Sequence, residues 1–239
     1  IDNDYYLHLC LDPYYISSSQ NYNKRHFNHP TFIYGYDEEK IYLKDFYSSG
    51  YKEYSAGYDD INTAYVSVLN NEFETRKYYG MVSMFKYSPV EYAFSIDKVI
   101  EDYTDYLNCT DRLHMYRDDI FYAELDGYLY GLDYYDALAY KIENCLYDVR
   151  PFHVLYDHKV LQEIRVRYMI ENELINGGEE ILSECVELKK LVQKLRNTVL
   201  KEIVAESQKP NIKLAELCLE IKQKDRLLVK KLLERIKEK

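Results

Sequence analysis

With 239 residues the chain is long enough to bury a substantial core, and its formal net charge of −10 argues against a nucleic-acid-binding protein, which needs a basic face for phosphates. The charge is uneven, because residues 189–239 carry 15 basic and 7 acidic side chains whereas residues 1–188 carry a net −18. Five widely spaced cysteines without a CxxC pair indicate neither a disulfide framework nor a zinc site, so a reducing cytoplasm is expected. No run of 18 apolar residues and no signal-like segment is visible, so neither a spanning helix nor secretion is predicted.

The first ninety residues are predicted to form a strand-rich region. Asp12-Pro13 closes the first apolar run as a turn, in which Asp12 is expected to act as a cap. The next two apolar runs are separated only by residues 37–39, which is short enough for a β-hairpin. Gly50 and Gly57 bracket an expected loop. The expected strands cover residues 5–11, 31–36, 40–46 and 78–87, and one helix is expected from Asp59 or Asp60 to about Asn70.

Beyond Pro89 the apolar residues recur at helical spacing. Ser95 begins an amphipathic stretch, Pro151 suits the first turn of a long helix, and Gly177-Gly178 ends that helix. The expected helices cover residues 95–107, 131–146, 152–175, 179–206 and 213–236. The last two are predicted to form a helical hairpin. The sequence therefore predicts an α+β fold in two regions, with a sheet in residues 1–90 and mostly helices in residues 91–239.

A histidine and an aspartate frame the predicted hairpin. His29 stands at the mouth of one strand and Asp45 at the end of the next, and neighbouring strands lie about 4.8 Å apart. The carboxylate can therefore accept a hydrogen bond from the imidazole, which is the role of the third member of a catalytic triad, and the histidine can then take a proton from a thiol. On spacing alone the alternative stays open that His29 is a loop histidine and Asp45 a strand-end charge.

The same segment resembles a known catalytic element. His29 is followed after five residues by Gly35-Tyr36-Asp37 and then by an apolar strand that ends in Asp45. This pattern is similar to the His/Asp element of papain-like bacterial peptidases, especially those that process bacteriocins by cleaving after a double glycine.

A longer resemblance covers most of the chain. Three segments carry it: LDPYYISSSQNYNKRHFNHPTFIYGYD (11–37), YGLDYYDAL (130–138) and DVRPFHVLYDHK (148–159). They resemble the papain-like family that includes the butirosin-biosynthesis acyltransferase and the amide-forming enzyme of closthioamide biosynthesis. In that family a cysteine takes an acyl group from a carrier-protein thioester and passes it to an amine. The resemblance implies a papain-like antiparallel sheet with a long helical C-terminal region, His29 as general base and Asp45 as its orienting partner.

The resemblance also implies the molecules that take part. The acyl group would arrive on the phosphopantetheine arm of an acyl or peptidyl carrier protein, and the acceptor would be a small-molecule amine in peptide or natural-product biosynthesis. No metal, no further cofactor, no nucleic acid and no membrane are expected, and the protein would be cytoplasmic. The C-terminal helices would shape the acceptor site or a homodimer.

The nucleophile of the family has no counterpart among the expected elements. In papain-like enzymes the cysteine begins a helix that precedes the strands, where the helix dipole lowers the thiol pKa. Here the residues before Cys10 are too few and too strand-like, and Cys10 is expected to be a buried core thiol. The other four cysteines lack a motif. Either the nucleophile lies upstream of Ile1 or it has been lost, so two further classes stay open: a papain-like cysteine peptidase and a catalytically inactive binding module.

His26 is the main rival of His29. It does not lead directly into the strand and is further from Asp45 along the chain, so it is expected to be a loop or substrate-side residue. For the remaining histidines a surface or packing role is expected, because none has metal-binding spacing with a carboxylate or a cysteine. They are His8, His114, His153 and His158.

Overall fold

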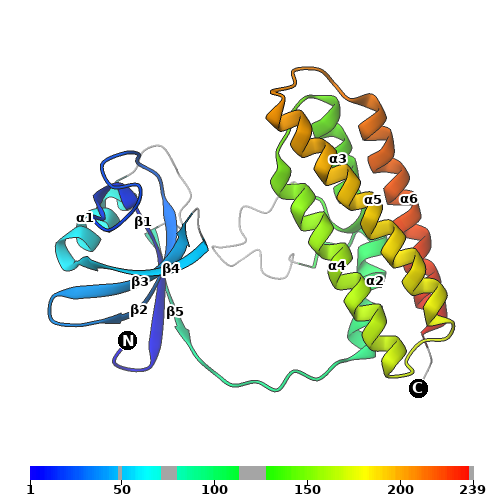
Figure 1. Cartoon of the computed structure of the whole chain (residues 1–239). Helices are drawn as coiled ribbons and strands as arrows, with labels where there is room; N and C mark the ends of the chain where they lie inside the picture. The colour runs from blue at the N-terminus through cyan, green and yellow to red at the C-terminus, as the bar shows by residue number, and fades with distance from the viewer. Residues whose placement is uncertain (48–49, 71–79, 113–127, 237–239) are drawn as a thin grey trace. The chain divides into compact units, whose positions relative to one another are not determined.

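The computed structural model describes residues 1–47, 50–70, 80–112 and 128–236 (Figure 1). The described residues form two compact units, one within residues 1–92 and the other over residues 93–112 and 128–236. The first unit contains the sheet and the second is helical, so the fold is mixed α+β, as the sequence predicts. The division falls after residue 92, where the sequence places it after residue 90.

The first unit is built on a five-stranded antiparallel sheet with the spatial order β4-β3-β2-β1-β5. The strands are β1 (Tyr5–Leu11), β2 (His29–Tyr36), β3 (Lys40–Tyr47), β4 (Gly50–Gly57) and β5 (Val82–Lys86). β2 and β3 form the predicted hairpin. The strand predicted at 78–87 corresponds to β5, and the first two of those residues lie outside the described residues.

The sequence predicts a loop between Gly50 and Gly57, and this prediction is wrong. The segment is β4, which pairs with β3 along its whole length, from Gly57 opposite Lys40 to Gly50 opposite Tyr47. The two glycines stand at the ends of the strand rather than in a turn. Burial hardly alternates along β4, because Ala56 near its end is buried whereas the residues near Gly50 are exposed. The strand is therefore defined by its pairing with β3 and not by an apolar pattern.

Side chains on one face of the sheet pack under helix α1 (Tyr58–Leu69). The core of this unit consists of Leu9, Leu11, Ile16, Ile33, Leu43, Ala56, Ile61 and Ala64. Ile33 on β2 and Leu43 on β3 are register partners and both point to this face. Because successive side chains of a strand point to opposite faces, the odd-numbered residues before Ile33 and after Leu43 point there as well. His29 is the register partner of Leu11, and Asp45 lies two residues beyond Leu43. Both therefore belong to the face that α1 covers.

A register shift interrupts the β2–β3 pairing far from His29. Ile33 pairs with Leu43, but Gly35 pairs with Tyr42, so β2 accommodates one extra residue as a bulge. A Cβ at Gly35 would lie 3.1 Å from Cδ2 of Tyr42, which explains why the smallest residue stands there. The shift lies toward the hairpin tip, and on the His29 side of it Ile33–Leu43 and Phe32–Lys44 keep one register.

The second unit is a helical bundle that begins with α2 (Ile96–Asn108), capped by Ser95. The other helices are the 3-10 helix η4 (Gly131–Asp133), α3 (Tyr134–Glu143), α4 (Val149–Glu171), α5 (Gly178–Val204) and α6 (Ile212–Arg235). α4 packs on α5, α5 on α6, and α3 on α6, so the predicted helical hairpin is present (Figure 1). None of the helices in the described part of the chain is long and apolar enough to cross a membrane.

Candidate acid–base site

His29 and Asp45 lie in direct contact beyond the apolar core of the sheet unit. Nε2 of His29 is 2.8 Å from Oδ1 of Asp45. The carboxylate is almost buried, with 9% of its side chain exposed, whereas 30% of the His29 side chain is exposed. The structure thus brings together the two residues that the sequence singles out, with the acid inside and the base facing outward.

Further donors fix the position of the Asp45 carboxylate. Oδ1 also accepts a hydrogen bond from the N–H of Phe46 at 2.6 Å, and the Tyr54 hydroxyl on β4 lies 3.5 Å from Oδ2. Because a carboxylate only accepts, Nε2 of His29 carries the proton and Nδ1 of the neutral ring keeps its lone pair. Among the described residues Nδ1 has no hydrogen-bond partner. Nδ1 is therefore the atom that could take a proton from a reacting group.

A second His–Asp pair, which sequence reasoning does not predict, involves His26. Its Nδ1 is 2.7 Å from Oδ2 of Asp12. Asp12 exposes 3% of its side chain and His26 exposes 54%, so the acid is again inside and the imidazole outside. Asp12 caps the 3-10 helix η1 (Pro13–Tyr15) through the N–H of Tyr14, which agrees with its predicted role as a turn cap.

The Asp12 carboxylate is saturated with hydrogen bonds. Oδ1 accepts from the N–H groups of Tyr14 (3.1 Å) and Phe27 (3.4 Å), and Oδ2 accepts from the hydroxyl of Ser67 on α1 (2.9 Å) as well as from His26. The imidazole stacks on the Tyr14 ring with 3.8 Å between centroids. Sequence spacing gives no signal for this pair, because the chain between its members runs through η1 and an irregular polar loop.

The two pairs lie at the same end of the β1–β2 ladder. Leu11, the register partner of His29, immediately precedes Asp12. The two imidazoles are anchored through different nitrogens: His29 is held at Nε2 and His26 at Nδ1. Two acid–base groups, each with one ring nitrogen left for chemistry, are thus built into one end of the sheet.

Cys10 does not face the His29 pair. It pairs with Pro30 on β2, one residue away from the Leu11–His29 pair, so its side chain points to the opposite face of the sheet. The thiol is buried, as the sequence predicts. The strand geometry therefore excludes Cys10 as the partner of His29 in this arrangement.

The other four cysteines belong to the helical unit. Cys185 and Cys218 are buried in its core, and burial raises the pKa of each thiol to about 12, so both stay protonated at neutral pH. Cys109 and Cys145 have left-handed backbone conformations just past the ends of α2 and α3.

The remaining described histidines have packing or surface positions. His8 makes an edge contact with Phe85, and His153 is exposed on α4. His158 packs against Tyr106, and burial lowers its pKa to about 3. His114 lies outside the described residues. Within the described ranges there is no group of three or more His, Cys, Asp or Glu side chains that could hold a metal ion.

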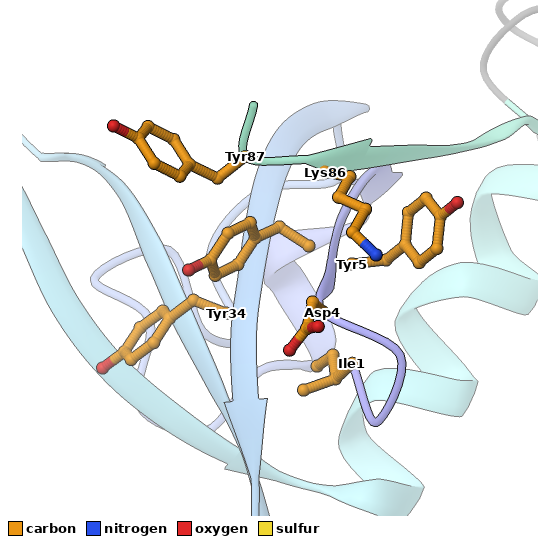
Figure 2. Close-up of a pocket in the computed structure, with 7 residues that line it drawn as sticks. Ile1, Asp4, Tyr5, Tyr34, Lys86 and Tyr87 are labelled. Atoms are coloured by element: carbon orange, nitrogen blue, oxygen red, sulfur yellow. The ribbon is translucent and has the colours of Figure 1, made fainter. Parts of the chain in front are cut away.

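A pocket of about 430 Å³ lies at the other end of the sheet (Figure 2). It is lined by Ile1, Asp4, Tyr5, Tyr6, Tyr34, Lys86 and Tyr87. The Lys86 ammonium stands over the Tyr5 ring, 5.4 Å from its centroid. Tyr5 precedes Leu11, the partner of His29, by six residues, which corresponds to about 20 Å along a strand. The pocket is therefore separate from the two His–Asp pairs.

No protein-family model matches the chain, and no curated protein matches it.

Proposed function

We propose that this chain is the base-bearing part of a papain-like cysteine acyltransferase, which transfers an acyl group from a carrier-protein thioester to an amine in the biosynthesis of a peptide or another natural product. The observation that carries the proposal is the 2.8 Å contact between His29 Nε2 and Asp45 Oδ1 on an antiparallel hairpin. An imidazole held by a carboxylate through one nitrogen is a base at the other nitrogen. The three segments that resemble the acyltransferase family support the same assignment.

In the first half-reaction the enzyme is loaded. A cysteine thiol gives its proton to Nδ1 of His29, and the sulfur attacks the carbonyl carbon of the carrier-bound thioester. A new carbon–sulfur bond forms and the bond to the phosphopantetheine sulfur breaks. That sulfur takes the proton back from His29 and leaves as a thiol. Throughout, Asp45 holds the ring in place and offsets its transient positive charge.

In the second half-reaction an amine attacks the acyl-cysteine. The carbon–nitrogen bond forms, the proton on the attacking nitrogen passes to Nδ1 of His29, and the cysteine sulfur leaves and takes that proton. The product is an amide. A peptidase would use the same groups but would admit water as the second nucleophile.

In this proposal the reacting thiol belongs to a cysteine outside residues 1–239. Cys10 points to the face of the sheet opposite to His29, and burial raises the pKa of Cys185 and Cys218 to about 12. In this proposal the protein works in the cytoplasm, and the phosphopantetheine arm arrives with its carrier protein as part of the substrate.

Mass spectrometry of the intact full-length protein tests the proposal. Incubation with the N-acetylcysteamine thioester of a short fatty acid should add one acyl group, and an amine should then remove it as an amide. His29→Ala should abolish the adduct, whereas the matched variant His153→Ala, at an exposed position on α4, should form it normally. An undiminished adduct on His29→Ala contradicts the role of His29. Hydrolysis of peptides without aminolysis would identify a peptidase, and the absence of any adduct would favour a binding module.

A further inference from the structure

The His26–Asp12 pair has no role in the loading step. His29 alone accepts the thiol proton and returns it to the phosphopantetheine sulfur, so the ring is neutral again when the acyl-cysteine has formed. His26 is held as firmly as His29, at 2.7 Å from its carboxylate, and a larger fraction of its side chain is exposed.

The acceptor brings a proton that His29 cannot take. At neutral pH an alkyl amine is an ammonium ion, and for an amine that titrates like a lysine side chain only on the order of one molecule in 10³ is free to attack. Attack then releases a second proton from the nitrogen, which His29 needs to receive so that the thiolate can be protonated. The ammonium must therefore lose its first proton before it attacks, and a second base beside the site would make that loss faster at neutral pH.

We propose that His26, oriented by Asp12, is the base that deprotonates the ammonium form of the acceptor amine. This inference rests on the acyl transfer proposed above. The N–H bond of the ammonium breaks, its proton binds Nε2 of His26, and the freed lone pair attacks the acyl-cysteine. His26 then releases the proton to water, which balances the overall reaction of an ammonium and a thioester to an amide, a thiol and one proton.

The surroundings of His26 match this task. The Asp12 carboxylate bonds Nδ1, so the proton of the neutral ring lies there and the lone pair lies on Nε2. Stacking on Tyr14 fixes the plane of the ring. Within the described residues Nε2 has no hydrogen-bond partner, and an exposed side chain can exchange its proton with solvent. The location at the same end of the β1–β2 ladder as His29 places both bases near one reaction.

Two variants distinguish a His26 that acts as a base from a His26 that only shields the Asp12 carboxylate from solvent. In His26→Asn the amide N–H replaces the Nδ1–H that bonds Asp12, but no base remains. In Asp12→Asn the carbonyl oxygen must stay at the position of Oδ1, which accepts the N–H groups of Tyr14 and Phe27. The NH₂ group then faces Nδ1 of His26, so the ring proton moves to Nε2 and the lone pair there is lost. His153→Asn is the matched control.

The test compares two acceptors on the loaded full-length protein. Ethanolamine is an ammonium ion at neutral pH, whereas hydroxylamine is unprotonated and needs no base to free its lone pair. Both His26→Asn and Asp12→Asn should load at the wild-type rate and transfer to hydroxylamine normally. Transfer to ethanolamine at neutral pH should fall by about 10²-fold and recover as the pH is raised toward the amine pKa.

The outcomes distinguish this inference from the function on which it rests. Equal transfer rates to ethanolamine in wild type and His26→Asn, an equal loss with both acceptors, or a loss of loading would each overturn the role of His26 while leaving acyl transfer intact. A wild-type protein that never forms an adduct would contradict the proposed function and the inference together.

Discussion

Lys159 and Asp225 form an ion pair inside the helical unit, with Nζ 2.5 Å from Oδ2 and with 1% and 0% of their side chains exposed. The same oxygen accepts hydrogen bonds from the hydroxyls of Tyr106 and Tyr135. Burial, and then the charge of Asp225, raise the pKa of both phenols well above their usual value, so they remain donors. The pair connects α4 with α6, while the tyrosines come from α2 and α3.

Removing one partner of this pair should strongly destabilise the helical unit. Lys159→Met leaves the buried Asp225 carboxylate with only the two phenols, and an uncompensated buried charge costs about 3–5 kcal/mol. Urea unfolding followed by the helical circular dichroism signal measures this loss. The double variant Lys159→Met/Asp225→Asn should regain most of it, because the neutral amide removes the unpaired charge and its carbonyl oxygen can still accept from the two phenols.

An exposed lysine provides the control for that experiment. Lys224 on α6 pairs with Glu220 at the surface, so Lys224→Met should change the free energy of unfolding by less than about 1 kcal/mol. If Lys159→Met were no more damaging than Lys224→Met, the interior would not depend on the ion pair. If the double variant were no more stable than Lys159→Met, loss of packing rather than an unpaired charge would be the cause.

His158 should make the helical unit sensitive to acid. Burial, and then the charge of Lys159, lower its pKa to about 3, whereas the unfolded value is 6.5. Between these values the unfolded state binds the proton and the native state does not, so the free energy of unfolding falls as the pH falls, by about 1.4 kcal/mol per pH unit. His158→Gln should flatten this dependence between pH 6 and pH 4.

The comparison for His158 is a histidine on the same helix. His153 is exposed, so His153→Gln should leave the slope of stability against pH unchanged. Denaturant unfolding at several pH values gives both slopes. A His158→Gln protein with the wild-type slope would mean that His158 is protonated in the native state.

The sequence predicts much of this fold because its strands and helices carry clear local signals. Apolar runs ended by turns define β1, β2 and β3, and helical spacing with Gly177-Gly178 defines α4 and α5. β4 escapes prediction because Ala56 is its one buried residue and its other residues include two glycines, a serine and two charged side chains. A strand that is held by pairing with β3 therefore has the composition of a loop. Lys159 escapes for a related reason: a lysine within a helix ordinarily lies on its solvated face.

The two His–Asp pairs also differ in how well the sequence predicts them. His29 and Asp45 stand on consecutive strands, whose spacing and direction are fixed by the hairpin, so the distance between them follows from counting residues. His26 and Asp12 are joined by η1 and a loop, for which counting gives no distance. Tertiary contacts set that distance: the Phe27 N–H bonds Asp12, the His26 ring stacks on Tyr14, and Ser67 on α1 bonds Asp12.

Asp45→Asn should retain much of the loading rate. Oδ1 accepts from both the Phe46 N–H and His29 Nε2–H, so the carbonyl oxygen of the asparagine is expected to take that position. Its NH₂ group then faces the Tyr54 hydroxyl, whose oxygen can accept. His29 keeps its proton on Nε2, and the loss of charge should slow loading by about tenfold or less.

Asp45→Ala sets the scale for that prediction, because it removes the acceptor and frees the His29 ring. Loading should then slow by about 10²-fold or more.

Nitrogen chemical shifts of an imidazole report which ring nitrogen is protonated. In Asp45→Asn the protonated nitrogen of His29 should remain Nε2, whereas in Asp12→Asn His26 should change its protonated nitrogen. If His29 moved its proton to Nδ1 in Asp45→Asn, or if that variant loaded as slowly as Asp45→Ala, the Phe46 N–H would not determine how residue 45 presents its side chain. The opposite responses of the two rings to the same substitution follow from where the backbone N–H groups point, and this relation is independent of the identity of the acyl group.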